Sequence, residues 1–91
     1  MESTLVIVPT YNEIENIEKV INLVLNLNDK FNLLIVDDSS PDKTSNKVRD
    51  LMSQFPERLF LEERKNKTGL GGAYIAGFNW ALKRNYNYIF Q

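Results

Sequence analysis

The chain contains no cysteine and no histidine among its 91 residues. The absence of cysteine excludes a disulfide framework, a thiolate nucleophile and cysteine-based zinc or iron–sulfur sites. The absence of histidine removes the Ser-His-Asp triad, the commonest general base and the commonest metal ligand. Any chemistry in this chain must therefore use carboxylates, lysine, arginine, tyrosine, hydroxyl or amide side chains, or backbone amides.

The chain also lacks a strong charge excess and a long hydrophobic run. Its net charge is −1, so no basic field attracts nucleic acid, and we expect no nucleic-acid partner. No apolar segment approaches the roughly 20 residues that span a bilayer, and the N-terminus lacks the pattern of a signal peptide. We therefore expect a cytoplasmic protein, and 91 residues correspond to at most one small domain.

Two short, uncharged and mostly β-branched runs are present, at Leu5–Val8 and Leu33–Val36. Such runs are typical of strands that are buried on both faces of a parallel sheet. Shorter apolar segments further along the chain predict two more strands. The predicted strands cover residues 4–8, 31–36, 59–61 and 86–90.

The segment after the first strand predicts an amphipathic helix. Asn12 is the expected N-cap, with Glu15 as the reciprocal partner of a capping box. The apolar residues recur every three or four positions, as one buried helix face requires. They are Ile14, Ile17, Val20 or Ile21, Val24 and Leu27.

Two further helices are predicted between the remaining strands. The second begins at Ser40-Pro41 or at Thr44 and ends by Pro56. The third opens at Gly69–Gly72 and reaches about Arg84. Glycines at a helix start can cradle a phosphate, but the spacing fits no phosphate-loop motif, so close packing of helix on sheet is the favoured interpretation.

This alternation predicts an α/β fold, a Rossmann-like parallel sheet of about four strands in the order 3-2-1-4 with helices on both faces. In open sheets of this kind, ligands bind at the carboxyl ends of the strands, where the strand order reverses. Polar clusters at Pro9–Glu13 and Asp37–Asp42 directly follow the first two strands. Their position favours a binding site over plain connections.

Three segments carry a resemblance to a known family. They are residues 8–13 (VPTYNE), residues 34–44 (LIVDDSSPDKT) and residues 67–78 (KTGLGGAYIAGF). Together they resemble the family 2 glycosyltransferases of GT-A fold, and the last segment resembles the branch of the dolichyl- and polyprenyl-phosphate mannose synthases. Ser39 departs from the pattern, where glycine or asparagine is commoner, and so does Lys43, where glycine is commoner.

The resemblance implies a nucleotide-sugar site on the two polar clusters. It places Pro9 and Tyr11 against the base, and a tyrosine ring offers a flat face for base stacking. It places Glu13 at the nucleoside, where a carboxylate accepts hydrogen bonds from a ribose hydroxyl or a base N–H. Glu13 would also be favoured by the dipole of a helix start.

The resemblance also assigns the residues that follow the second strand. It implies that Asp38, together with the backbone of Val36, contacts the base, because a carboxylate pairs with the N–H groups of guanine or uracil. Adjacent residues of a strand point in opposite directions. Asp37 is therefore expected to hold the loop or the ribose region.

The resemblance makes residues 1–91 the N-terminal, nucleotide-sugar-binding part of a glycosyltransferase domain, truncated before an Asp-x-Asp metal motif expected just after Gln91. It implies transfer of a hexose, with mannose and GDP-mannose favoured, to a polyprenyl or dolichyl phosphate with inversion. A divalent cation, Mg²⁺ or Mn²⁺, would serve the intact enzyme, which would work at a membrane face. No catalytic residue or metal ligand is expected within the chain, which alone would be inactive, and open sheet edges favour self-association.

Several alternatives stay open. The chain is a nucleotide-binding half-domain without activity of its own, or a family 2 transferase that uses a UDP-sugar for polysaccharide or lipid glycosylation. A signalling receiver domain is disfavoured, because no aspartate follows Asp50 to accept a phosphoryl group. A nicotinamide-binding module is disfavoured as well, because Pro9–Glu13 contains no glycine for a phosphate-binding turn.

Overall fold

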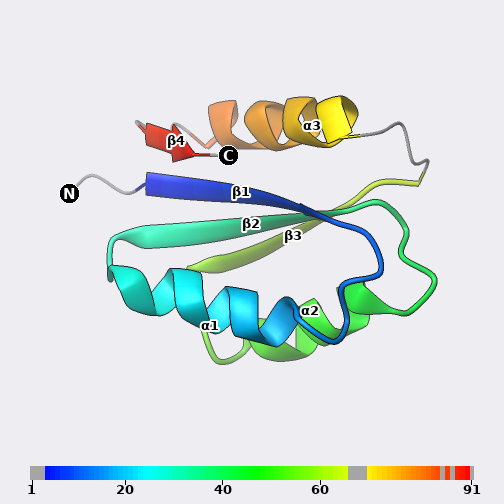
Figure 1. Ribbon diagram of the computed structural model, residues 1–91. Helices are drawn as coiled ribbons and strands as arrows, with labels where there is room; N and C mark the ends of the chain where they lie inside the picture. The colour runs from blue at the N-terminus through cyan, green and yellow to red at the C-terminus, as the bar shows by residue number, and fades with distance from the viewer. Residues whose placement is uncertain (1–3, 66–69, 85, 87, 91) are drawn as a thin grey trace.

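The computed structural model describes residues 4–65, 70–84, 86 and 88–90. Strands and helices alternate along these residues (Figure 1). The elements are β1 (Thr4–Thr10), α1 (Ile17–Leu27), β2 (Phe31–Asp37), α2 (Thr44–Met52), β3 (Leu59–Glu63), α3 (Leu70–Leu82) and β4 (Tyr88–Phe90). All neighbouring strands pair in parallel, in the order β3-β2-β1-β4. The predicted fold class and strand order are therefore confirmed.

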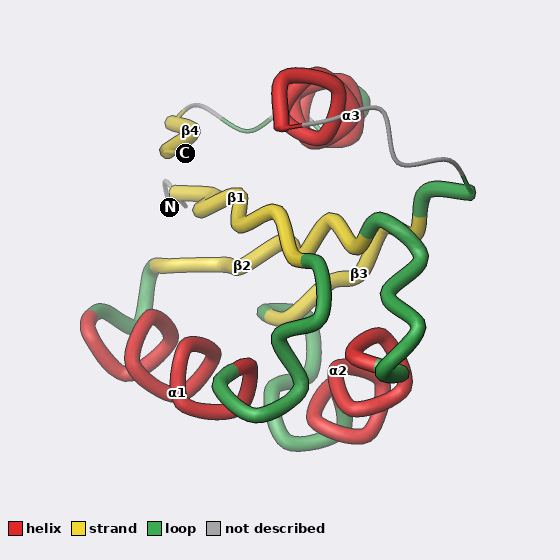
Figure 2. The backbone as a smooth tube through the Cα atoms, turned by 45° about the vertical axis from the view of Figure 1, so that its right-hand side comes forward, coloured by secondary structure: helices red, strands yellow, loops and turns green. Residues whose placement is uncertain are grey.

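The sheet separates two helical layers. Helices α1 and α2 cover one face and α3 covers the other (Figure 2). Side chains of β2 alternate between the layers, because successive residues of a strand face opposite ways. Leu33 and Ile35 belong to the core beneath α1 and α2, whereas Leu34 and Val36 belong to the core beneath α3. The apolar run of β2 therefore fills two cores at once.

Helix α1 begins later than predicted. Its N-cap is Asn16, and the predicted N-cap Asn12 has a positive φ of 55°. The N–H groups of Asn16 and Ile17 both donate to the carbonyl of Glu13, at 3.0 and 2.8 Å, so a turn precedes the helix. The predicted capping box of Asn12 and Glu15 is wrong, because the helix starts at Ile17 and the backbone N–H groups of residues 12–14 donate to the side chains of Ser40, Thr44 and Asp42.

This late start changes which residues of α1 are buried. The fully buried positions are Ile17, Ile21 and Leu25. Ile14 and Leu27, predicted to face the core, are 38% and 67% exposed. Ile14 lies before the helix and Leu27 is its last residue, so neither is held against the sheet.

The strands are longer at their carboxyl ends than predicted. β1 continues to Thr10 and β2 to Asp37, so Pro9 and Asp37 belong to strands and not to loops. Helix α2 begins at Thr44, the second of its two predicted starts, and ends at Met52, before Pro56. Gly69, in the predicted opening of α3, lies outside the described residues.

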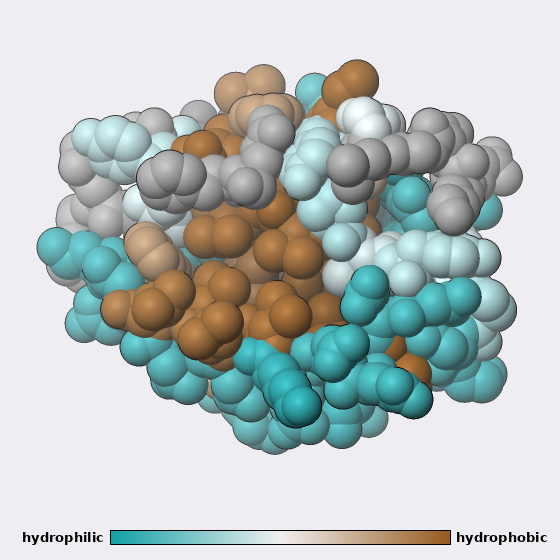
Figure 3. Space-filling model, in the orientation of Figure 1, coloured by the Kyte–Doolittle hydropathy of each residue, from teal (hydrophilic) through white to brown (hydrophobic). Residues whose placement is uncertain are grey.

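One face of the molecule carries an apolar area. In the orientation of Figure 1, hydrophobic residues gather between α1 and α3, and hydrophilic residues surround this area along the lower side and on the right (Figure 3). Strand β4 pairs with β1 only along Thr4, Leu5 and Val6. The rest of β1 therefore has no described strand on that side.

Candidate nucleotide-binding site

The carboxyl ends of β1 and β2 lie side by side. Thr10 is in register with Asp37, and the N–H of Asp38 donates to the carbonyl of Thr10 at 3.2 Å. Residues 11–16 and 38–43, which we call the first and second rim loops, leave the sheet together at this edge (Figure 1). Tyr11 and Asp38 therefore start from adjacent points of one rim.

Asp37 anchors this rim from inside. Its side chain is fully buried. Oδ1 accepts hydrogen bonds from the hydroxyls of Thr10, at 2.7 Å, and Ser40, at 2.6 Å, and Oδ2 accepts one from the backbone N–H of Ser40 at 3.0 Å. These contacts match the loop-holding alternative for Asp37. A role in ligand contact is not supported, because its oxygens face protein groups.

Side chains at the start of α2 and in the second rim loop hold the first rim loop. They accept hydrogen bonds from three consecutive backbone N–H groups. The N–H of Asn12 donates to Ser40 Oγ (2.9 Å), that of Glu13 to Thr44 Oγ1 (3.1 Å) and that of Ile14 to Asp42 Oδ2 (3.2 Å). The amide oxygen of Asn12 accepts a long return bond from the N–H of Asp42 at 3.4 Å. We call this set of hydrogen bonds the loop clamp.

Asp42 is the charged member of the loop clamp. Burial raises the pKa of its carboxyl, but hydrogen bonds from the Thr44 hydroxyl and from the N–H groups of Ile14 and Thr44 lower it, and the net pKa lies below the ordinary value of 3.8. The clamp therefore favours the ionised carboxylate. Its hydrogen bonds give Ser40, Asp42 and Thr44 a structural role in the segment that follows β2.

Asp38 faces an arginine that the sequence analysis did not single out. Arg64 Nη1 lies 3.2 Å from Asp38 Oδ1, and the two side chains are only 14% and 8% exposed. The backbone N–H of Arg64 donates to the carbonyl of Asp37 at 2.8 Å, and the hydroxyl of Ser39 donates to the carbonyl of Arg64. The sequence did not identify Arg64, because it lies in a charged segment that is typical of a solvated loop.

The other predicted site residues differ in how far they are exposed to solvent. Tyr11 is 39% exposed and Glu13 is exposed, so both are accessible to a ligand. Pro9 is half-buried in β1 and pairs with Val36 of β2. The side chain of Val36 is fully buried in the core beneath α3, which leaves only its backbone for the implied contact.

A sequence model described as "Glycosyl transferase family 2" matches residues 5–90. The chain belongs to glycosyl transferase family 2. The resemblance noted from the three sequence segments is therefore confirmed at the level of the family. The match covers every described strand except the first residue of β1.

Relatives of this family 2 chain are named as mannose transferases that act on polyprenyl phosphates. It is 41% identical to the polyprenol monophosphomannose synthase of Mycolicibacterium smegmatis over 99% of this chain and 34% of that protein. It is 39% identical to the undecaprenyl-phosphate mannosyltransferase of Micrococcus luteus over 96% of this chain and 35% of that protein. The chain thus spans about a third of the length of these curated relatives.

A solved structure shows the same fold as the family 2 chain. It is a mannosyltransferase from Pyrobaculum calidifontis in complex with GDP-Man and Mn²⁺, with a TM-score of 0.76 and 31% identity. The likeness covers 86% of this chain and 24% of that one. The parallel sheet described above is therefore the corresponding part of a GT-A mannosyltransferase fold.

The described residues of the family 2 chain offer neither a metal cluster nor a membrane span. Among them, no group of three histidine, cysteine, aspartate or glutamate side chains could hold a metal ion. Likewise, no helix within the described ranges is long and apolar enough to cross a bilayer. The resemblance assigns the divalent cation to a motif expected just after Gln91, and the described residues of the rim supply no cluster that fits it.

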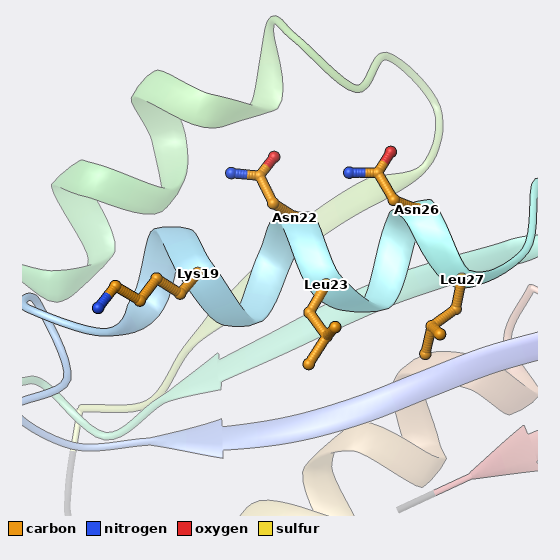
Figure 4. A pocket seen from close by; sticks show the side chains of 5 residues that line it. All are labelled: Lys19, Asn22, Leu23, Asn26 and Leu27. Carbon is orange, nitrogen blue, oxygen red and sulfur yellow. The ribbon is translucent and has the colours of Figure 1, made fainter.

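A shallow groove lies elsewhere, along the outer surface of α1 (Figure 4). It is lined by Lys19, Asn22, Leu23, Asn26 and Leu27, all from one helix. A single helix face lacks the convergent polar groups from different elements that mark a ligand site. The rim, and not this groove, is the candidate site.

Proposed function

We propose that this chain is the nucleotide-sugar-binding part of a polyprenyl-phosphate mannosyltransferase, with GDP-mannose as the donor. The proposal rests on the position of Tyr11 and Asp38. They follow the ends of two adjacent parallel strands, and the N–H of Asp38 donates to the carbonyl of Thr10. The activities of the relatives support the acceptor class, and the GDP-Man complex of the solved neighbour supports the donor.

Each rim residue has a distinct role in this proposal. The ring of Tyr11 stacks on the base, and Pro9 contacts the base as well. The carboxylate of Glu13 accepts from a ribose hydroxyl. Asp38, beside the backbone of Val36, accepts from the N–H groups of the base. Asp37 and the loop clamp hold these groups in place without touching the ligand.

The proposed reaction requires little general-base catalysis. An acceptor phosphate oxygen is already anionic, so it can attack the anomeric carbon directly, with inversion, as the leaving diphosphate departs. This suits a rim without histidine. The divalent cation and its motif just after Gln91 remain part of the proposal, as do a cytoplasmic location near a membrane face and self-association through the sheet edges.

Calorimetric titration of the chain with GDP-mannose and UDP-glucose tests the proposal. We expect binding of GDP-mannose in preference to UDP-glucose. Tyr11→Ala should weaken GDP-mannose binding by about 5- to 150-fold, because base stacking on an aromatic ring is worth about 1–3 kcal/mol. Tyr88→Ala is the matched control, because Tyr88 is an exposed tyrosine of β4 that is 53% accessible.

The control should leave the affinity unchanged. Preference for UDP-glucose would overturn the choice of donor but not the site. Equal effects of the two tyrosine substitutions would show that the base does not bind at the rim. Binding of neither nucleotide sugar would overturn the proposal altogether.

A further inference from the structure

Backbone groups of β1 alternate between the two neighbours of this strand. The N–H of Thr4 donates to the carbonyl of Lys30, at the start of β2, at 3.1 Å. The carbonyl of Thr10 accepts from the N–H of Asp38 at 3.2 Å, so the even-numbered residues of β1 face β2. Along a strand, the N–H and C=O of one residue point to the same side, and those of the next residue point to the other. The odd-numbered residues, Pro9 among them, therefore face the edge on which β4 pairs.

Pro9 interrupts the series of backbone donors along this edge. A proline has no backbone N–H, and a ring carbon occupies the place of the missing hydrogen. Strand β4 pairs with β1 along Thr4, Leu5 and Val6. Beyond that pairing, Ile7 is the last residue of β1 that can donate to a strand on this side before Pro9. Proline within a sheet is normally confined to such edge positions.

The interrupted edge lies where the order of the strands reverses. β2 lies on one side of β1 and β4 on the other, and helices cover both faces of the sheet (Figures 1 and 2). Sheets of this kind bind ligands in the crevice outside the carboxyl ends of the strands, at this reversal. Pro9 is the last residue but one of β1, directly before the first rim loop. A strand that paired with β1 along this part would occupy the crevice.

The surface beside this edge is apolar. Leu23 and Leu27 of α1 are 66% and 67% exposed, and the apolar area between α1 and α3 lies along β1 (Figures 1 and 3). An open strand edge next to an apolar surface is a template for pairing with a second chain, and proline is one of the features that prevent such pairing. The position of Pro9 thus has a consequence for what can occupy the crevice.

We propose that Pro9 is a positioning residue that ends strand pairing along β1 and so keeps the crevice beside the rim open to the nucleotide sugar. It acts through its missing N–H, in addition to the base contact proposed for its ring. This inference rests on the proposed function, since it concerns how the same site stays accessible. It directs the proposed self-association to the other edge of the sheet, at β3.

Pro9→Ala restores the missing N–H and tests this role. A second copy could then pair along β1 as far as the rim. Sedimentation velocity should therefore show self-association about 10-fold stronger than that of the unsubstituted 91-residue chain, because each copy gains a hydrogen bond. In the dilute monomer, hydrogen exchange at the new amide should be fast, whereas the amides of Val8 and Thr10, which face β2, should be protected.

Two controls separate the missing N–H from other effects. A chemically synthesised chain with N-methylalanine in place of Pro9 lacks both the N–H and the ring, and it should associate no more strongly than the unsubstituted chain. Pro56→Ala changes an exposed proline outside the sheet, and it should leave self-association unchanged. Thermal unfolding of each variant checks that the fold is kept.

A ligand arm connects the association to the crevice. GDP-mannose should dissociate the self-associated Pro9→Ala chain, because the ligand and the second copy compete for the same space. A general loss of stability would not produce an association that the ligand reverses. If the unsubstituted chain binds GDP-mannose but the ligand leaves the associated variant intact, the second copy does not occupy the crevice, and the inference is wrong.

The remaining outcomes are distinguishable. The inference is overturned if Pro9→Ala associates no more strongly than the unsubstituted chain, or if its new amide is protected in the monomer. Equal association of the alanine and N-methylalanine chains would assign the effect to the ring and would overturn it as well. If the unsubstituted chain binds no GDP-mannose, the proposed function fails, whereas the association measurements still decide whether Pro9 ends strand pairing.

Discussion

Three residues of the rim loops have left-handed backbone conformations. Asn12 and Ser39 have φ of 55°, and Lys43 has φ of 68°. A side chain with a Cβ is unfavourable in this region by about 1–2 kcal/mol, and glycine is the usual occupant. The two departures from the family pattern, Ser39 and Lys43, thus lie at positions where the backbone favours glycine.

Replacement of Lys43 tests this strain. Lys43 is exposed and lies directly before α2 with φ of 68° and ψ of 33°. Lys43→Gly should raise the free energy of unfolding by up to about 1 kcal/mol, because the relief of strain exceeds the added flexibility of the unfolded chain. Chemical denaturation measures the change.

Lys43→Ala is the control, since it removes the same charge but keeps the Cβ. It should give no gain in stability. If alanine stabilises the chain as much as glycine does, the charge of Lys43 and not its backbone conformation is the cause, and the strain argument is wrong.

At the scale of single residues, chemistry was easier to predict than position. The side chains of Tyr11 and Asp38 were recognisable, because a strand end followed by polar residues marks a rim. The start of α1 was not, because Asn12 and Glu15 satisfy a capping pattern whose outcome depends on Ser40 and Thr44, far along the chain. Arg64 was missed for the same reason, since only tertiary contacts bury it.

At the scale of elements, α3 approaches the sheet closely at Gly77. A Cβ built on Gly77 would lie 2.6 Å from Ile7 Cγ2, which belongs to a buried residue of β1. Close packing of helix on sheet, favoured in the sequence analysis for the glycines at the helix start, therefore applies to Gly77 and not to Gly71. Trp80 extends the same contact, with its ring 5.0 Å from that of Phe60.

Two glycines of α3 form a matched pair for testing the close contact between this helix and the sheet. Gly77→Ala should lower the free energy of unfolding by about 1–3 kcal/mol, because overpacking a filled core forces the backbone or Ile7 to move. At Gly71 a Cβ would meet no described atom within 4 Å, so Gly71→Ala should be neutral or stabilising by up to about 1 kcal/mol. Thermal and chemical unfolding should show a lower free energy of unfolding for Gly77→Ala and an equal or higher one for Gly71→Ala. Equal effects of the two substitutions would contradict the close approach of α3 to Ile7.

Arg58 shows why element boundaries were harder to predict than elements. Its guanidinium donates to the carbonyls of Leu25, Asn28 and Phe31, at 2.8–2.9 Å through Nη2. It thus joins the end of α1 to the start of β2 from the segment before β3. The apolar runs identified these elements because burial dictates their composition. Their ends depend on such long-range polar contacts, which leave no local pattern.

At the scale of the whole molecule, the order of strands was predictable. A parallel sheet with right-handed crossovers leaves few arrangements for alternating strands and helices. The exposure of Leu27 was not predicted, since the sequence analysis placed it on the buried face of the helix but it is 67% exposed. Nor was the apolar area between α1 and α3 predicted (Figure 3). The surface therefore has an apolar area between α1 and α3, in addition to the polar rim at the ends of β1 and β2.

The central claim, that the rim binds a sugar nucleotide, is tested most directly by backbone amide NMR shifts during titration with GDP-mannose. We expect the largest shifts at Tyr11, Glu13, Asp38 and Arg64. The amides of Leu23 and Leu27, in the groove on α1, serve as internal controls and should not move. Shifts that gather on α1, or spectra unchanged at millimolar GDP-mannose, would contradict the account.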